Sequence, residues 1–166
     1  DRGDLATALT YLEQSLAIQR EIGDKAGEGV TLNNISLIYH DRGDLATALT
    51  YLEQSLAIQR EIGDKAGEGV TLNNISLIYH DRGDLATALT YLEQSLAIRR
   101  EIGNKAEEGV TCWNIGFIYK DQGDLVRAEE YISRTVQIDE EIGHPDLEKD
   151  RAALEQIRQA LKSGQS

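Results

Sequence analysis

The residues in this chain that could carry out chemistry are few, and they return at an interval of forty positions. His40 and His80 occupy the same place in successive copies, and neither has a second His or a Cys three or four positions away. Cys112 is the sole cysteine and stands where Leu32 and Leu72 stand in the earlier copies, so we interpret it as a small core residue. The sequence therefore predicts no catalytic site, no metal and no cofactor.

Three asparagines are better suited to binding than to catalysis. Asn34, Asn74 and Asn114 repeat at the interval of forty, and each amide offers two donors and one acceptor. A column of such amides could hold the backbone of a bound peptide whatever its sequence. In the alternative interpretation, each amide bonds to a carbonyl group of a neighbouring helix and needs no ligand.

Aromatic residues appear where the third copy departs from the others. Trp113 and Phe117 replace Asn73 and Leu77, and four positions apart on a helix they share one face. Buried tryptophan often anchors interfaces, with truncation costing roughly 2 kcal/mol or more. Alternatively, both rings pack against the last helix of the chain.

These residues are positioned by a repeat. Residues 1–40 return letter for letter as residues 41–80, and again as residues 81–120 with eight substitutions. A catalytic site needs one convergent set of unlike residues, whereas a repeat of this length indicates units that bury their apolar faces against one another. The chain is therefore predicted to present an extended interaction surface.

Each unit contains two segments with helical periodicity and short turns between them. Asp44 is placed to cap one helix, Gly63 to end it, and Asp64 to cap the next. Because short turns make consecutive helices antiparallel, we expect an all-α fold of helix pairs. The predicted helices lie near 2–22, 25–40, 44–62, 65–80, 84–102, 105–120, 124–142 and 146–162.

The last segment differs from the repeats. After His144 and Pro145 a new helix begins, with apolar residues on one side and charged residues on the other. We therefore predict a repeat array over 1–143 and a C-terminal capping helix and tail over 144–166. The apolar residues of the capping helix are Leu147, Leu154, Ile157 and Leu161.

Composition narrows the class of partner. The net charge is -12, and no cluster of Lys and Arg suited to phosphate backbones is present, so nucleic acid and membranes are not expected partners. A basic or neutral protein segment fits better. A single cysteine suits a reducing, cytoplasmic compartment. The absence of Met indicates a piece of a longer chain.

The unit resembles the tetratricopeptide repeat, a helix–turn–helix with a characteristic pattern of small and apolar residues. The resemblance spans residues 1–143, although the period is 40 rather than 34 and the usual Pro is absent. It is similar to the longer repeats of kinesin light chain and of scaffolds that bind G-protein alpha subunits, and it implies a right-handed superhelical solenoid. The matching positions are Leu32, Ile35, Ser36, Tyr39, Gly43, Ala48 and Leu52.

The resemblance also implies that one stripe of the first helix of each pair lines a concave, peptide-binding groove. We call this set of residues the groove stripe. It comprises positions 30, 33, 37 and 40 in the first copy, 70, 73, 77 and 80 in the second, and 110, 113, 117 and 120 in the third. In chaperone-binding members this stripe carries a basic clamp, which is missing here. With the asparagine column, the candidate groove residues are Asn33, Asn34, Leu37, His40, Asn73, Asn74, Leu77, His80, Trp113, Asn114, Phe117 and Lys120.

We expect a non-catalytic scaffold that binds a peptide or protein segment in this groove. A second hypothesis is a self-assembling structural module, because the first helix lacks its natural partner. Its leucine face is then expected to bind another copy and form a homo-oligomer. A third is a designed or consensus-like repeat sequence with no ligand. The leucines of the exposed face are Leu5, Leu9, Leu12 and Leu16.

Overall fold

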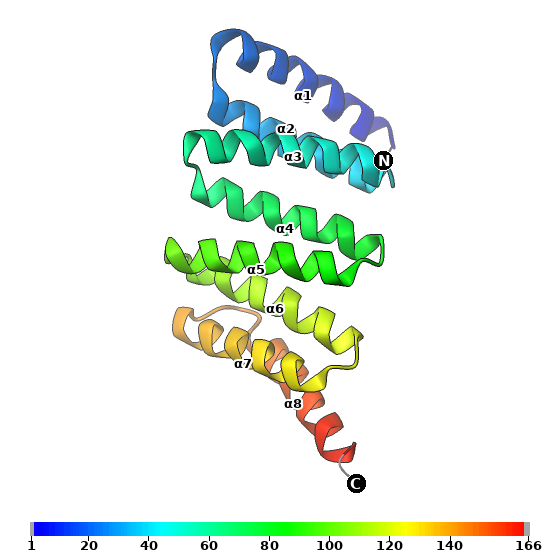
Figure 1. The fold of residues 1–166 in the computed structure, drawn as a ribbon, viewed down its shortest axis with the longest axis vertical. Helices are drawn as coiled ribbons and strands as arrows, with labels where there is room; N and C mark the ends of the chain where they lie inside the picture. Colours follow the sequence, from blue (N-terminus) through cyan, green and yellow to red (C-terminus); the bar gives the residue numbers. More distant parts are fainter. Residues whose placement is uncertain (1, 165–166) are drawn as a thin grey trace. The chain divides into compact units, whose positions relative to one another are not determined.

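The computed structural model describes residues 2–164 and is all-α over this range (Figure 1). Each helix begins and ends within about a residue of its predicted bounds. The helices are α1 (Arg2–Ile22), α2 (Lys25–Asp41), α3 (Leu45–Ile62), α4 (Lys65–Asp81), α5 (Leu85–Glu101), α6 (Lys105–Asp121), α7 (Leu125–Ile142) and α8 (Leu147–Ser163).

The chain divides into two compact units, Asp1–Ala88 and Leu89–Ser166, which we describe separately. In unit 1, helices α1 to α4 pack in chain order, and α2 also contacts α4. In unit 2, α6 packs on α7 and α7 on α8. The predicted boundary between array and cap, at 143/144, falls in the loop between α7 and α8. Residue 1 and residues 165–166 of those predicted segments lie outside the described residues.

The predicted caps explain why the helices end where they do. Gly63 adopts a left-handed conformation with φ of 71°, which residues with a side chain rarely adopt. The carboxylate of Asp64 then accepts a hydrogen bond of 2.9 Å from the backbone N–H of Gly67. Asp44 caps α3 in the same way, through the N–H of Thr47. These caps reverse the chain within two residues and make successive helices antiparallel.

In three hairpins, an ion pair between a half-exposed arginine and a nearly buried glutamate braces the glycine turn. In unit 1, Nε of Arg60 lies 2.8 Å from Oε1 of Glu68, and Arg20 meets Glu28 at the same distance. In unit 2, Arg100 and Glu108 lie 3.1 Å apart. The glutamate side chains are nearly buried, so each needs its cation to offset the cost of desolvation.

The core of unit 1 forms from the interleaved apolar positions of α1, α2 and α3. Leu32 and Ile35 are fully buried there. The Tyr39 and Tyr51 rings stack with centroids 5.5 Å apart, and Ile58 packs opposite Gly29, where an added Cβ would lie 3.6 Å from its side chain. In this way α3 is covered by the helix that precedes it.

The expected exposure of the α1 leucines is wrong. Leu9 and Leu16 are buried, and Leu5 and Leu12 pack against the same core, because these leucines face α2, the next helix in the chain. The face of α1 that corresponds to the covered face of α3 is a different one. It carries Tyr11 and Ile18, which are 67 % and 57 % exposed.

Unit 2 is closed by α8. Leu154 and Ile157 are buried, and Leu147 and Leu161 are half-buried, as the predicted apolar side requires. Between α6 and α7, Gly116 allows a close approach: a Cβ added there would lie 2.7 Å from Cδ1 of Ile132. The hairpin that carries Trp113 is therefore packed more tightly than a larger residue at position 116 would permit.

Candidate peptide-binding surface

The apolar members of the groove stripe remain exposed in unit 1. On α2, Val30 is 55 % and Leu37 40 % exposed, and on α4, Val70 is 40 % and Leu77 42 % exposed. Leu32 and its neighbours on the other faces of the same helices are fully buried. Folding therefore uses one face of each helix and leaves the predicted stripe open to solvent.

In unit 1, Asn33 of the groove stripe bonds to polar residues that lie outside the stripe. Oδ1 of Asn33 accepts a hydrogen bond of 3.0 Å from the Nδ2 amide of Asn74 and a longer one from Thr71. Asn34 is exposed, whereas Asn33, Asn73 and Asn74 are half-buried. The Asn74 amide therefore bonds to a neighbouring helix, as in the alternative interpretation that needs no ligand. Its acceptor is a side-chain oxygen and not a backbone carbonyl group.

The two histidines of unit 1 share one carboxylate. Nε2 of His40 lies 2.6 Å from Oδ2 of Asp81, and Nδ1 of His80 lies 3.4 Å from the other oxygen. The hydrogen bond with His40 holds the pKa of Asp81 below its ordinary value. The histidines thus contact an acid at the end of α4, a contact that the forty-residue interval did not indicate.

In unit 2 the stripe is aromatic. The Trp113 and Phe117 rings lie 6.0 Å apart and are tilted by 32°, and the Lys120 ammonium lies 5.0 Å from the centre of the Phe117 ring. Phe117 is 43 % exposed. Trp113 is half-buried, as is Asn114 beside it, and Nζ of Lys149 on α8 lies 5.7 Å from its ring centre. Trp113 thus contacts the last helix, as the alternative interpretation expects, while Phe117 keeps much of its surface exposed.

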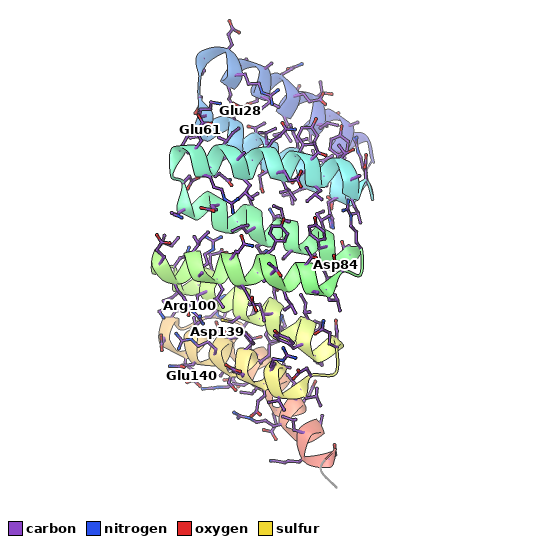
Figure 2. All side chains as sticks on the ribbon, in the orientation of Figure 1. Glu28, Glu61, Asp84, Arg100, Asp139 and Glu140 are labelled. Carbon is purple, nitrogen blue, oxygen red and sulfur yellow. The ribbon has the colours of Figure 1, made fainter. Side chains whose placement is uncertain are left out.

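Two groups of polar residues escaped the sequence analysis. One is the Glu108 carboxylate, which Arg100, Lys105 and Arg134 surround. These cations lower its pKa although burial alone would raise it. The other is a buried pair of carboxyl groups, Asp139 on α7 and Asp150 on α8. Figure 2 labels Asp139 beside Glu140 near the carboxyl end of α7.

The groups with catalytic or metal-binding potential stay apart. Cys112 is fully buried, and burial raises the pKa of its thiol to about 11, so it is a core residue as predicted. Across residues 2–164, no three His, Cys, Asp or Glu side chains converge as metal ligands. Within the same range, none of the helices combines the length and apolar character of a membrane span.

Antiparallel helix pairs with recurring caps and an exposed stripe define the class of helical-repeat interaction domains. The chain belongs to the tetratricopeptide repeat family, whose models match residues 1–61, 30–101 and 110–142. Members of this family are generally protein-interaction modules. The predicted family and the predicted all-α, tetratricopeptide-like fold class are both confirmed.

Similar solved structures include BtubC and a kinesin light chain, and the second agrees with the sequence resemblance. BtubC (BKLC) from P. vanneervenii is 19 % identical over 99 % of this chain and 69 % of its own, with a TM-score of 0.88. The nearly identical TPR-like repeats of a kinesin light chain from Podosopora anserina are 21 % identical over 99 % and 82 %, with a TM-score of 0.77.

A third similar structure is PH0952 from Pyrococcus horikoshii, a signal transduction ATPase with numerous domains that has a tetratricopeptide repeat sensor. It is 21 % identical over 92 % of this chain but 24 % of its own, with a TM-score of 0.80. Likeness at these identities establishes the fold. A comparison with curated proteins finds no match.

Proposed function

We propose that this chain is a non-catalytic scaffold that binds a peptide or protein segment on the groove stripe. One observation carries the proposal: the stripe places six apolar side chains at the surface, two on each of α2, α4 and α6. Val110 and Phe117, at 46 % and 43 % exposure, continue in unit 2 the pattern of unit 1. Apolar side chains seven positions apart on one helix face suit an extended or helical segment.

The chemistry of the stripe indicates the kind of segment. Apart from Lys120, its members are apolar, amide-bearing or aromatic, and the net charge of the chain is -12. Such a surface favours a neutral or basic segment and repels an acidic one. We place this scaffold in the cytoplasm, because its sole cysteine is a buried thiol that suits a reducing compartment.

The proposal is tested with a library of random dodecapeptides displayed on phage and selected against the chain. Selected peptides are synthesised, and their affinity is measured for the chain and for matched surface variants. Leu77→Ser and Phe117→Ser alter the stripe. Ile62→Ser and Ile142→Ser remove side chains of nearly equal exposure, 39 % and 40 %, from other helices.

We expect the stripe variants to weaken binding at least about tenfold, a loss of about 1.4 kcal/mol, and the controls to change it less than about twofold. Trp113→Ala is expected to weaken binding while the helical circular dichroism remains. Failure to select any peptide, or equal losses in stripe and control variants, contradicts the proposal. A sharp fall in melting temperature for Trp113→Ala assigns the aromatic pair to stability instead.

A second candidate function is self-assembly through α1. Tyr11 and Ile18 are exposed, while the identical residues of the next copy, Tyr51 and Ile58, pack against α2. A helix of the α2 type from a second copy would cover them. If so, sedimentation at high concentration detects oligomers that Ile18→Ser dissociates. A monomer at all concentrations excludes this function.

A further inference from the structure

A small pocket lies within unit 2 where α6, α7 and α8 meet. Its volume is about 100 Å³, enough for a small polar group rather than for a whole ligand. Val110 and Trp113, both members of the groove stripe, form one wall, so the pocket adjoins the proposed binding surface. The other walls include Asp139 from α7, His144 from the α7–α8 loop, and Lys149 and Asp150 from α8.

The pocket contains two carboxyl groups that are almost inaccessible to solvent. Asp139 is 4 % exposed and Asp150 6 % exposed. The Oδ2 atom of Asp139 is buried without a hydrogen-bond partner among the described residues. A buried acceptor without a partner costs free energy, and more so when it is charged. A ligand that donates hydrogen bonds and carries positive charge would remove that cost.

The carboxyl pair is in electrostatic conflict in the absence of such a ligand. Burial, together with hydrogen bonding and repulsion from Asp139, raises the pKa of Asp150 to about 6. Near neutral pH Asp150 is therefore largely ionised, although it is buried beside Asp139. Among the surrounding charges, Lys149 opposes this repulsion and Asp146 adds to it.

The repeat itself does not require an acid at this place. The positions equivalent to Asp139 are Gln19, Gln59 and Arg99, and Gln59 is as deeply buried as Asp139. Arg99 lies 3.6 Å from Glu107, a residue that replaces Gly67 of the earlier copy. A neutral or a cationic residue thus fits the hairpin, so the acid at 139 calls for an explanation other than folding.

The aromatic wall already attracts a cation. Nζ of Lys149 lies 5.7 Å from the centre of the Trp113 ring, within the range of a cation–π contact. Lys149 is otherwise exposed at the surface. An incoming cation would therefore find a carboxyl pair and an aromatic ring among the lining residues of the pocket, with Lys149 as its competitor.

We propose that this pocket binds the cationic head of a basic side chain, arginine above all, carried by the segment that occupies the groove stripe. The inference rests on the proposed function and adds a specific contact to it. A planar guanidinium group can donate to both carboxylates and at the same time stack flat on the Trp113 ring. An ammonium group has no plane and cannot stack in this way. A metal ion is disfavoured, since no trio of metal-binding side chains converges in the described residues.

The test uses Nα-acetyl-arginine amide as the probe and Nα-acetyl-citrulline amide, its neutral isostere, as the control. Trp113 is the sole tryptophan, so its fluorescence reports on this pocket directly. We expect a saturable change with the arginine probe and at least about tenfold weaker binding of citrulline. Equal responses to the two probes, or no saturable response to arginine, overturn the proposal.

Variants locate the binding site. Asp139→Gln restores the residue of the first two copies, and Asp150→Asn is nearly isosteric; each should weaken arginine binding at least about tenfold. Lys149→Gln removes the competitor and should tighten binding several-fold. Glu155→Gln, an exposed acid on the same helix as Asp150, should leave it unchanged. Unaltered affinity in both aspartate variants contradicts the proposed pocket.

The two proposals can fail separately. Selected peptides that respond to Leu77→Ser, with no arginine binding, keep the scaffold function and exclude the pocket. If Trp113 fluorescence shows that the arginine probe binds but no peptide is selected on the stripe, the arginine site is supported and the scaffold function is excluded.

Discussion

His40 on α2 lies 2.6 Å from Asp81 at the end of α4, a residue forty-one positions later. Asn33 and Asn74 are also forty-one positions apart and also share a hydrogen bond. Side chains at equivalent positions, forty apart, would form ladders if the copies stacked without an offset. At these two contacts in unit 1, a residue of α2 instead meets the residue of α4 that follows its equivalent.

The contact between His40 and Asp81 should contribute modestly to stability, because the Asp81 side chain is 35 % exposed. We expect Asp81→Asn to lower the free energy of unfolding by less than about 1 kcal/mol in urea denaturation at neutral pH. Since the pKa of Asp81 is lowered in the folded chain, this contribution is present above about pH 4 and disappears as pH falls through the lowered value.

The matched control is Asp41→Asn. Asp41 occupies the same place in the first copy, but its contact with His40, at 3.7 Å, lies within the same stretch of chain. An equal loss in the two variants would mean that the contact between the copies adds no stability.

Removal of the Asp150 charge should stabilise the protein at neutral pH. The folded chain holds the Asp150 proton up to about pH 6, whereas the ordinary pKa is 3.8. Stability therefore falls as pH rises between these values and stays lower above them. We expect Asp150→Asn to be more stable than the parent by about 1–3 kcal/mol at pH 7 and to lose this pH dependence. Urea denaturation at a series of pH values measures both effects, with Glu155→Gln as control. A destabilised Asp150→Asn protein would contradict the predicted repulsion.

Gly116 and Gly29 should respond in opposite ways to alanine. At Gly116 the new methyl group would meet Ile132 too closely, so we expect a net loss of about 1–3 kcal/mol from overpacking. At Gly29 the nearest atoms are 3.6 Å away, and helix propensity should give a gain of about 0.5–1 kcal/mol. Thermal melting of both variants checks the contrast, and recovery by Gly116→Ala with Ile132→Val would identify the clash. Equal shifts at both glycines contradict it.

Cys112 should report on unfolding by its reactivity. Because burial raises its pKa to about 11, very little thiolate exists at pH 8, and reagents cannot reach it in the folded chain. We expect iodoacetamide to label the native protein at least roughly a hundredfold more slowly than the protein in urea. Rapid labelling of a chain with intact circular dichroism would show that this part of the core opens readily.

The sequence alone predicted the helices and their ends, because the Gly-Asp junctions recur every twenty residues and each has a fixed conformation. Gly63 and Asp64 show the reason: one residue must adopt positive φ, and the next caps the following helix. The buried face of α2 was equally readable from periodicity, whereas the open stripe with Leu37 and Phe117 was expected from the family resemblance.

Contacts between different helices could not be predicted in the same way. The link from His40 to Asp81 depends on an offset between copies that identical sequences do not encode locally. Asp139 and Asp150 come together because the His144–Pro145 turn departs from the repeat, and no other copy contains that turn for comparison. The leucine face of α1 was misassigned because an amphipathic helix with two apolar sides does not reveal which neighbour each side meets.

The letter-for-letter identity of residues 1–40 and 41–80 has a consequence for how the length of this protein can change. His40 and His80 precede the same four residues, Asp-Arg-Gly-Asp, so excision of residues 41–80 leaves every remaining junction with an unchanged local sequence. Unequal recombination between copies can therefore add or delete whole hairpins without creating any unfamiliar turn. Selection can therefore change the length of such a protein in steps of forty residues while the sequences of its helices and turns stay the same.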